Sequence, residues 1–417
     1  MMEHSFGTVS VIGLGYIGLP TATMFASRGK HVIGVDVSQP AVDAINQGRA
    51  HIIEPGLDEI VRTVVSSGSL RAVMNPEPAD AFIVAVPTPV DHVTHVPDTS
   101  YVEAAGRSIA PVLRAGNLIV LESTSPVGTT RQLAQVMAKL RPDLRFPLDG
   151  ETAPDIYLAY CPERIIPGQM LRELVENDRI IGGMSGECTK RATALYATFV
   201  KGQCLQADDR TAELCKLTEN AFRDVNIAFA NELSMVCDDI GIDAWKVIEL
   251  ANHHPRVSIL NPGAGVGGHC IAVDPWFIVA SSPERARLMR TAREVNDSKP
   301  EYILAKVARI LEHNPGARIA CLGLAYKPDV DDFRESPALE IALRLNTQYP
   351  ENVVIADPFA FALSAIKDSR VGQLRVESAE EAINGADVVL MLVGHSAFRS
   401  LSRPQGVELI DAVGFWR

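Results

Sequence analysis

The stretch Thr8-Val9-Ser10-Val11-Ile12-Gly13-Leu14-Gly15-Tyr16-Ile17-Gly18 decides the fold of the first part of the chain. Its opening residues are rich in β-formers, and the glycine-rich turn that follows leads into a helical pattern over residues 19–28. His31–Val35 then predicts a second buried strand, which ends at Asp36. In this strand–helix–strand order, glycines permit a tight turn and place the helix N-terminus against a pyrophosphate. The segment therefore predicts a dinucleotide-binding βαβ unit.

This unit and two later turns carry the residues that we expect to hold the cofactor. Asp36 stands where a carboxylate accepts hydrogen bonds from the adenosine ribose, which favours NAD over NADP. The nearly all-apolar strands predicted at 81–86 and 117–122 end in polar turns, and ligands bind beyond the carboxyl ends of such strands. Thr124 would position a water or a hydroxyl, although simple turn duty is an equally good interpretation. The expected cofactor contacts are Gly13, Gly15, Tyr16, Ile17, Gly18, Asp36, Pro87, Thr88, Ser123 and Thr124.

Length, composition and charge place the chain among multidomain globular proteins. It has 417 residues, 47% of them apolar and 22% charged, so we expect two or three domains. A net charge of −12 gives no help to nucleic-acid binding, and an anionic substrate would need local Lys and Arg clusters. The segment 1–7 lacks a basic patch followed by an apolar run, and no apolar run approaches the roughly 18 residues of a membrane span. We therefore expect a cytoplasmic protein that binds neither nucleic acid nor membrane.

A long helical pattern runs from residue 208 to residue 241 without proline or glycine inside it, which suggests a spine between two domains. Lys216 and Asn220 are four residues apart, so both project from one face of this helix. Apolar residues at spacings of three and four predict one buried stripe, formed by Leu214, Leu217, Ala221, Val225, Ala228, Leu233 and Val236.

The second half begins with two predicted helices, 285–297 and 302–313, and then repeats the α/β alternation. Strands are predicted at 319–324, 353–356 and 388–393, with a helix at 338–345. The predicted fold class is α/β, with two Rossmann-like, doubly wound parallel-sheet domains joined by a long helical linker. We expect an NAD-binding domain at 1–203, a central helical linker with the cysteine turn at 204–312, and a second Rossmann-like domain at 313–417.

One of the seven cysteines has an unusual setting. None of them shows a CxxC or zinc-like spacing, so we expect reduced thiols and no metal site. Cys270, however, follows a glycine-rich segment that begins at Gly263 and precedes Asp274 by four residues. A thiolate there would attack an aldehyde, although a structural cysteine is the competing interpretation.

The chemistry of such a thiol explains the neighbouring candidates. Lys216 and Asn220 would stabilise the oxyanion of a hemithioacetal. A second hydride transfer would give a thioester, and either Asp274 or Glu163 would activate the water that hydrolyses it. A later loop bears Lys327 and Arg334 at a strand's carboxyl end, which suits a nucleotide diphosphate.

Together these motifs resemble the UDP-glucose/GDP-mannose dehydrogenase family over essentially the whole chain. The resemblance rests on residues 13–20, 86–89, 123–129 and 162–164, on Lys216 with Asn220, on residues 268–270 with Asp274, and on Lys327 with Arg334. It implies oxidation of a UDP-sugar by NAD through a thioester on Cys270, with Lys216, Asn220, Asp274, Glu163 and Thr124 in the active site. It implies that 313–417 is the UDP-sugar-binding domain and that 204–312 is also a dimerisation region. The resulting homodimer or higher oligomer would have Arg256 reach a neighbouring subunit's sugar nucleotide. Further residues that it places near substrate or cofactor are Arg164, Gly267, Lys327 and Arg334.

Within the family the sequence departs from the UDP-glucose branch, in which a Pro-Lys-Asp run follows the cysteine. Here Ile271-Ala272-Val273-Asp274 follows it. This difference, His269 and the ending 411–416 favour UDP-N-acetyl-D-mannosamine as substrate and a role in making surface polysaccharide. UDP-N-acetylglucosamine and UDP-glucose are the alternatives.

Two other classes share parts of the pattern. A β-hydroxyacid dehydrogenase would have the fingerprint and the Lys216/Asn220 pair but would need no thiol and would form one NADH per substrate. A non-catalytic NAD sensor would bind the cofactor without turnover.

Overall fold

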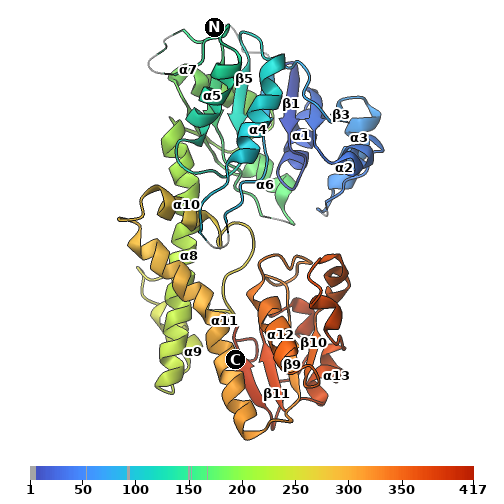
Figure 1. The fold of residues 1–417 in the computed structure, drawn as a ribbon, viewed down its shortest axis with the longest axis vertical. Coiled ribbons are helices and arrows are strands. Elements are labelled where there is room, and N and C mark those ends of the chain that lie inside the picture. The colour runs from blue at the N-terminus through green and yellow to red at the C-terminus, as the bar shows by residue number, and fades with distance from the viewer. Residues whose placement is uncertain (1–5, 53, 92–93, 149–150, 152, 167) are drawn as a thin grey trace. The chain divides into compact units, whose positions relative to one another are not determined.

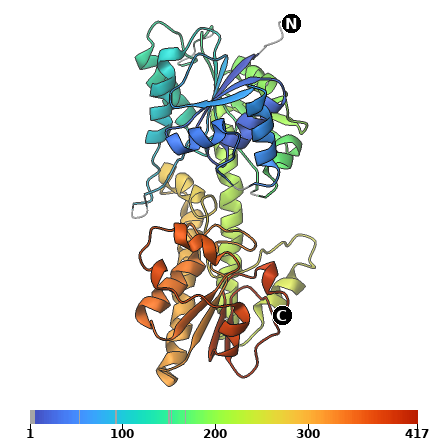
Figure 2. The same ribbon diagram turned by 90° about the vertical axis from the view of Figure 1, so that its right-hand side faces the viewer.

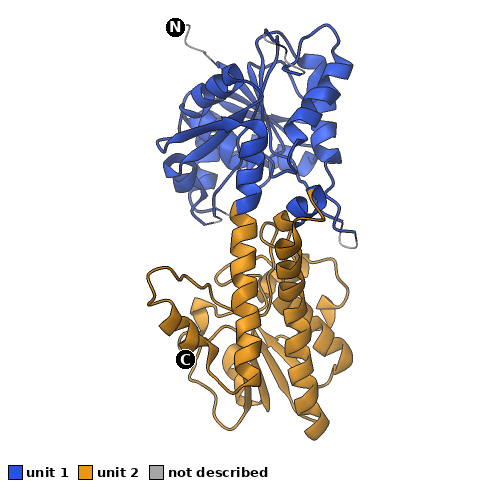
Figure 3. Ribbon diagram, turned by 90° about the vertical axis from the view of Figure 1, so that its left-hand side faces the viewer, with its two compact units in different colours: residues 1–218, 276–281 blue, residues 219–275, 282–417 orange. Residues whose placement is uncertain are grey.

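The computed structural model describes residues 6–52, 54–91, 94–148, 151, 153–166 and 168–417 (Figure 1). Chain contacts divide it into two compact units, residues 1–218 with 276–281 and residues 219–275 with 282–417 (Figure 3). The division of the sequence into three domains at 203 and 312 therefore stays a prediction. No helix among the described residues is long and apolar enough to cross a membrane.

The first unit is built on an eight-stranded sheet in the order β3-β2-β1-β4-β5-β6-β7-β8. Its strand pairs are parallel except β6 and β7, which are antiparallel. The strands are β1 (Thr8–Ile12), β2 (His31–Val35), β3 (Leu70–Val73), β4 (Ala81–Val84), β5 (Leu118–Leu121), β6 (Tyr157–Tyr160), β7 (Arg179–Gly183) and β8 (Cys204–Asp208). The helices are α1 (Gly18–Ser27), α2 (Gln39–Asn46), α3 (Leu57–Ser66), α4 (Ser100–Ile109), α5 (Thr129–Leu140), α6 (Met170–Glu176) and α7 (Gly186–Tyr196).

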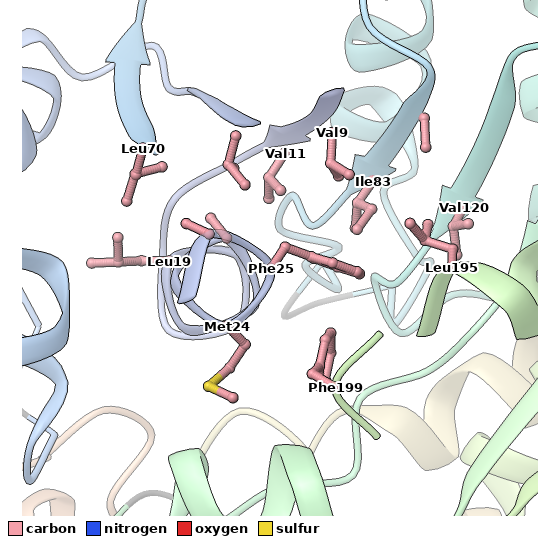
Figure 4. Packing of buried hydrophobic residues seen from close by; sticks show 14 of the residues in the cluster. Val9, Val11, Leu19, Met24, Phe25, Leu70, Ile83, Val120, Leu195 and Phe199 are labelled. Atoms are coloured by element: carbon pink, nitrogen blue, oxygen red, sulfur yellow. The ribbon is translucent and has the colours of Figure 1, made fainter. Parts of the chain in front are cut away.

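Two hydrophobic cores form because alternate strand residues point to opposite faces of this sheet. Ile83 and Val120 belong to the core that α1, α3, α6 and α7 cover, whereas Phe82 and Leu121 belong to the core beneath α4 and α5. Figure 2 shows helices on both faces of the sheet. Figure 4 shows Phe25 of α1 in the first core, where its ring meets that of Phe199 edge-on with the centroids 4.8 Å apart.

The second unit has a four-stranded, all-parallel sheet in the order β10-β9-β11-β12. Its strands are β9 (Ile319–Leu322), β10 (Val353–Ala356), β11 (Val388–Met391) and β12 (Glu408–Asp411). Its helices are α9 (Ala244–Ala251), α11 (Arg287–His313), α12 (Pro337–Gln348) and α13 (Ala379–Asn384), with short 3-10 helices η2 (Ala360–Ala365), η3 (Val371–Gln373) and η4 (Ser396–Phe398). A further short helix, η1 (Ala110–Val112), lies in the first unit, while α8 (Asp209–Asp239) and α10 (Asp274–Ser281) have residues in both units.

The predicted fold class is confirmed, and the two halves repeat one detail. Gly13 and Gly323 both have positive φ, +88° and +76°, and each follows the first strand of its half. The next backbone N–H then donates to the carboxylate that ends the neighbouring strand, Leu14 to Asp36 at 2.8 Å and Leu324 to Asp357 at 2.6 Å. The same turn therefore closes both Rossmann-like halves, although the second lacks the full glycine fingerprint.

Two helix predictions need correction. The two helices predicted at 285–297 and 302–313 form one helix, α11, which runs through Pro300. Proline lacks an N–H, so its place inside a helix leaves the carbonyl of Asn296 without its usual intrahelical bond. Tertiary packing of buried residues such as Ile303 and Val307 holds the helix together across this point.

The second correction concerns α8, whose predicted apolar stripe is only partly buried. Leu214 and Val236 are 44% and 49% exposed, whereas Leu217, Ala221 and Ala228 are buried. The fully or almost fully buried face is instead largely polar, formed by Asp209, Glu213, Asn220, Asp224 and Asn231.

Within the second unit, α11 and the segment that leads to Cys270 pair with most of this polar face of α8. Among the described residues, one Asp224 oxygen and the Nε of Arg293 are buried without a hydrogen-bond partner. Asn231 accepts a hydrogen bond from the N–H of Gly263 and donates to Asn296, both at 2.9 Å. Asn296 in turn donates to Asp224 at 2.8 Å, and Arg293 pairs with the same carboxylate at 2.7 Å. These hydrogen bonds offset most of the free-energy cost of burying the polar groups.

We expect Asn231→Leu to destabilise the second unit by about 2–6 kcal/mol, because it leaves the Gly263 N–H and the Asn296 oxygen unpaired at about 1–3 kcal/mol each. Urea unfolding followed by tryptophan fluorescence reports on this unit through Trp245 and Trp416. The exposed residue Glu294 of α11 provides the control variant Glu294→Ala, for which we expect a change within about 0.5 kcal/mol. An Asn231→Leu protein as stable as the control would contradict this account of α8.

Candidate active site

The glycines of the dinucleotide turn have different duties. A Cβ on Gly13 would meet the Ala85 carbonyl oxygen at 2.5 Å, and one on Gly18 would meet the Gly13 carbonyl oxygen at 1.8 Å. These two glycines are required by the packing of the chain itself. A Cβ on Gly15 would meet nothing within 4 Å, so the missing side chain leaves open space in front of α1. That space fits a pyrophosphate drawn close to the helix N-terminus.

Asp36 lies at the end of β2, where the sequence predicts the ribose acceptor. One carboxylate oxygen accepts from the Leu14 N–H and the other from the Ser38 N–H, both at 2.8 Å. Each oxygen has a second lone pair for a ribose hydroxyl. The residues present therefore fit NAD.

The two predicted turns that follow β4 and β5 are tied to each other. The Thr88 hydroxyl donates to the Thr124 carbonyl at 2.5 Å, and the buried Ser123 hydroxyl donates to the Val86 carbonyl at 2.7 Å. Pro87 lies between the two contacts along the chain. The Ser123 hydroxyl therefore stabilises the turn, which is the alternative role that the sequence allowed for the Ser and Thr hydroxyls of these turns.

Glu163 and Arg164 follow β6. Glu163 is 7% exposed, and one of its carboxylate oxygens lies 2.5 Å from the guanidinium of Arg179. The other oxygen accepts from the Arg164 N–H at 2.7 Å, while the Arg164 guanidinium donates to the Asp178 carbonyl at 3.1 Å. Glu163 is therefore held on both oxygens by its own unit.

The second unit brings together three candidates, Asn220, Asp274 and Cys270. The Asn220 amide donates to the Asp274 carboxylate at 2.5 Å, and both side chains are buried. The Asp274 N–H donates to the Cys270 carbonyl at 2.8 Å, which closes a turn that leaves Cys270 exposed. Lys216 is half-buried one turn before Asn220 on α8. The structure therefore places an exposed cysteine in a turn that ends at a carboxylate held by a buried amide.

The glycines before Cys270 allow this turn to pack against the loop between β9 and α12. A Cβ on Gly267 would meet the Glu335 carbonyl oxygen at 2.3 Å, and one on Gly268 would meet the Tyr326 ring at 2.9 Å. Glycines before a reactive cysteine can also let the backbone come close to a substrate. The close approach that the structure shows is to the protein's own loop.

That loop carries Lys327 and Arg334. Burial and the Arg223 guanidinium lower the pKa of Lys327, against the opposing effects of Asp332 and Cys270. Arg334 is exposed and holds Asp332 through two hydrogen bonds, of 2.8 and 2.6 Å. Of the remaining predicted residues, Tyr16 is 40% exposed, Ile17 is half-buried, and Arg256 is exposed in the segment that follows α9.

Sequence reasoning missed the charged groups buried behind Glu163. Glu122 follows β5 and is 1% exposed, and Arg179 begins β7 and is 3% exposed. Both lie next to the apolar residues of a buried strand. A charged residue in such a position was the sequence signal that could have indicated a buried ion pair. It gives no partner, because 57 residues separate them and only the sheet order brings them together.

Known proteins that are similar to the chain define its family. Profiles of the UDP-glucose/GDP-mannose dehydrogenase family match residues 7–200 with its NAD-binding domain, 210–298 with its central domain and 320–413 with its UDP-binding domain. The fold and site define an NAD-dependent nucleotide-sugar 6-dehydrogenase. The chain belongs to the UDP-glucose/GDP-mannose dehydrogenase family.

Several relatives match the chain over nearly its whole length. A protein of Ralstonia nicotianae named NDP-N-acetyl-D-galactosaminuronic acid dehydrogenase is 57% identical, covering 100% of this chain and 97% of that protein. The UDP-N-acetyl-D-mannosamine dehydrogenase of Escherichia coli is 52% identical, covering 99% and 100%. Among solved structures, the UDP-N-acetyl-mannosamine dehydrogenase of Staphylococcus aureus superposes with a TM-score of 0.85 at 42% identity, covering 98% of this chain and 96% of that one.

We expect Gly15→Ala to weaken NADH binding by at least about tenfold, or about 1.4 kcal/mol, because the added methyl group stands where the pyrophosphate approaches. Its melting temperature should equal that of the natural protein. Gly13→Ala is the contrasting variant, since its positive φ and its clash with Ala85 should lower the melting temperature. Calorimetric titration and thermal unfolding separate the two effects. Unchanged NADH affinity in Gly15→Ala would reject the assignment of this turn.

Proposed function

We propose that the chain oxidises C6 of UDP-N-acetyl-D-mannosamine from the alcohol to the carboxylate through a hemithioacetal and a thioester on Cys270. The observation that carries the proposal is the exposed Cys270 thiol in a turn fixed by the buried Asn220–Asp274 hydrogen bond. Bound NAD⁺ would accept one hydride in each of two oxidation steps.

The chain's own residues would perform the remaining chemistry. Deprotonated Cys270 adds to the aldehyde carbon, and Lys216 and Asn220 stabilise the negative charge on the oxygen. After the second oxidation a water adds to the thioester carbon, the C–S bond breaks and Cys270 leaves as a thiolate. Asp274 or Glu163 takes the proton from that water. Thr124 and Ser123, with Thr88 and Pro87, would border the nicotinamide.

Substrate recognition is assigned to both units. Lys327 and Arg164 would contact the sugar nucleotide, with Gly267 in the turn before the thiol. Arg334 would lie near the cofactor, and Arg256 would reach the site of a second subunit. We expect this reaction to take place in the cytoplasm and to supply an acidic sugar for surface polysaccharide.

UDP-N-acetyl-D-galactosamine is the second candidate substrate. A relative named for N-acetyl-D-galactosaminuronic acid is 57% identical to the chain, whereas the relatives named for N-acetyl-D-mannosamine are 52–54% identical. Both sugars carry a 2-acetamido group. We keep the manno sugar because its enzymes recur among the solved structures at 38–42% identity.

With UDP-N-acetyl-D-mannosamine, we expect two NADH per uronate formed, because the thiol retains the aldehyde until the second oxidation. Cys270→Ser should lower uronate formation by at least about 1,000-fold, since a serine hydroxyl is a far weaker nucleophile than a thiolate at neutral pH. The measurement is NADH absorbance against uronate by chromatography, over a panel of manno, galacto and gluco 2-acetamido UDP-sugars and UDP-glucose. One NADH per substrate, or full activity of Cys270→Ser, would reject the four-electron scheme. Turnover of another panel member alone would reject the proposed sugar.

We also propose that two copies associate through α8. Phe222, Phe229 and Val236 are 68%, 55% and 49% exposed. They are spaced by seven residues, so they form one apolar strip along the helix, as helices that pair with another helix do. Exposed Ile240 and Ile242 continue the apolar surface beyond the end of α8.

We expect Phe229→Glu to convert a dimer into a monomer in light scattering, because it places a charge in the middle of this strip. Phe361 in η2 is 71% exposed and serves as the matched control. Phe361→Glu should leave the mass unchanged. A natural protein that is monomeric and fully active would refute the proposed dimer.

A further inference from the structure

The first unit contains a buried cation that the reaction scheme above does not use. Arg179 is the first residue of β7 and is 3% exposed. Its guanidinium lies 2.5 Å from one Glu163 oxygen and 3.5 Å from one Glu122 oxygen. It also lies over the ring of Tyr196, 4.9 Å from the centroid. One arginine therefore bridges two buried carboxylates.

Glu122 joins this arginine to the dinucleotide-binding helix. Its carboxylate accepts from the Tyr196 hydroxyl at 2.8 Å on one oxygen and from the Thr21 hydroxyl at 3.2 Å on the other. Thr21 lies in the first turn of α1, directly behind the glycine turn. A continuous set of contacts therefore runs from α1 through Glu122 and Arg179 to Glu163.

Burying these three charged groups costs free energy, so their retention indicates a functional role. Taking charges out of water costs several kcal/mol per ion, and a well-packed apolar cluster often replaces buried ion pairs without loss of stability. Here the cation meets the very carboxylate that is a candidate base, and the second carboxylate fixes the cation. Arg179 and the Arg164 N–H occupy one acceptor position on each Glu163 oxygen, which leaves the other positions for water.

We propose that Arg179, anchored by Glu122, is a positioning residue that holds Glu163 in the orientation in which it activates the water that hydrolyses the Cys270 thioester. This inference rests on the function proposed above. In this step the water oxygen bonds to the thioester carbon, its proton passes to the Glu163 carboxylate, and the C–S bond breaks to release the Cys270 thiolate. No electrons are exchanged, so the step needs no oxidant.

The first test is Arg179→Lys, studied by stopped-flow NADH absorbance with saturating UDP-sugar and NAD⁺. A lysine presents one compact ammonium and cannot span both carboxylates as the planar guanidinium does. The expected result is a burst of two NADH per active site followed by a steady state that is slower than that of the natural enzyme by at least about tenfold. KM for the sugar nucleotide should change by less than about threefold. Arg179→Gln should lose more than Arg179→Lys, because only the lysine keeps a positive charge.

Two results would overturn the proposal. One is an unchanged steady-state rate. The other is an equal slowing of the NADH burst and the steady state, which would indicate general damage to the unit and no specific effect on hydrolysis.

Arg131→Lys is the matched control, because Arg131 pairs with the fully buried Asp209 at 2.8 Å in the same unit and has no contact with Glu163 in the described residues. It should show neither the burst nor the slower steady state. The natural enzyme's ratio of two NADH per uronate tests the proposed function by itself. A ratio of two with normal Arg179→Lys kinetics would therefore reject the positioning role alone.

Glu122→Gln provides a second test, which can be used even if the Arg179 variants do not fold. Glutamine has nearly the same size as glutamate and keeps one acceptor oxygen, so we expect this variant to fold. Burial raises the pKa of Glu122 to about 7, with attraction to Arg179 acting against the shift and Glu163 adding to it. Glu122 is therefore mostly neutral at pH 6 and mostly ionised at pH 8. The other titratable groups that face it are the Tyr196 phenol and the Cys161 thiol, whose pKa values burial raises, the latter to about 12, so both stay neutral.

The natural enzyme and Glu122→Gln should accordingly have similar steady-state rates at pH 6. At pH 8 the variant should be slower by at least about threefold, since only the natural enzyme then has a charged anchor for Arg179. A ratio of the two rates that stays constant from pH 6 to pH 8 would contradict the anchoring role of Glu122.

Discussion

The hydrogen bond between Asn220 and Asp274 is the contact on which the proposed chemistry depends. It joins α8 to the turn that presents Cys270, and both partners are buried. Two further amides of α8 hold the chain that leads to this turn. Asn226 bonds to the Ser258 carbonyl and the Leu260 N–H at 3.1 and 2.9 Å, and Asn231 bonds to the Gly263 N–H. The long helix therefore fixes the segment that carries the thiol. If this segment moved, the amide side chains of α8 would lose their hydrogen bonds, which would cost free energy.

In the Rossmann-like halves, side-chain carboxylates hold the glycine turns by accepting hydrogen bonds from backbone N–H groups. Asp36 and Asp357 each bind the N–H groups of a glycine turn, and the second also accepts from the buried His395 at 3.2 Å. In the second half this carboxylate is thus committed to the protein's own structure. The first half keeps open space at Gly15, where the pyrophosphate of NAD fits against the N-terminus of α1.

The sequence predicted seven of the strands and the dinucleotide unit, because buried parallel strands are short apolar runs and the glycine turn has fixed spacing. It did not predict β3, β6, β7, β8 and β12. Of these, β3, β8 and β12 are edge strands with exposed residues, so they do not form continuous apolar runs. β2 and β10 occur at the predicted residues, and several other strands are only two residues shorter than predicted. The face of α8 was predicted poorly, since apolar periodicity assumes that the buried face is apolar. Asp224 and Asn231 are buried because Arg293 and Asn296 of α11 pair with them, and no local pattern reveals such partners. The contact between Arg179 and Glu122 was not predicted for the same reason, because no local sequence pattern links the two residues.

The central claim is that one sulfur atom carries the sugar between its two oxidations. Rapid acid quenching during turnover, followed by mass spectrometry of the peptide that contains Cys270, tests this claim most directly. The account predicts a peptide whose mass is raised by that of the UDP-uronyl group and an adduct that disappears when the substrate is exhausted. A Cys270 peptide that stays unmodified throughout turnover, or an adduct on another cysteine, would contradict it.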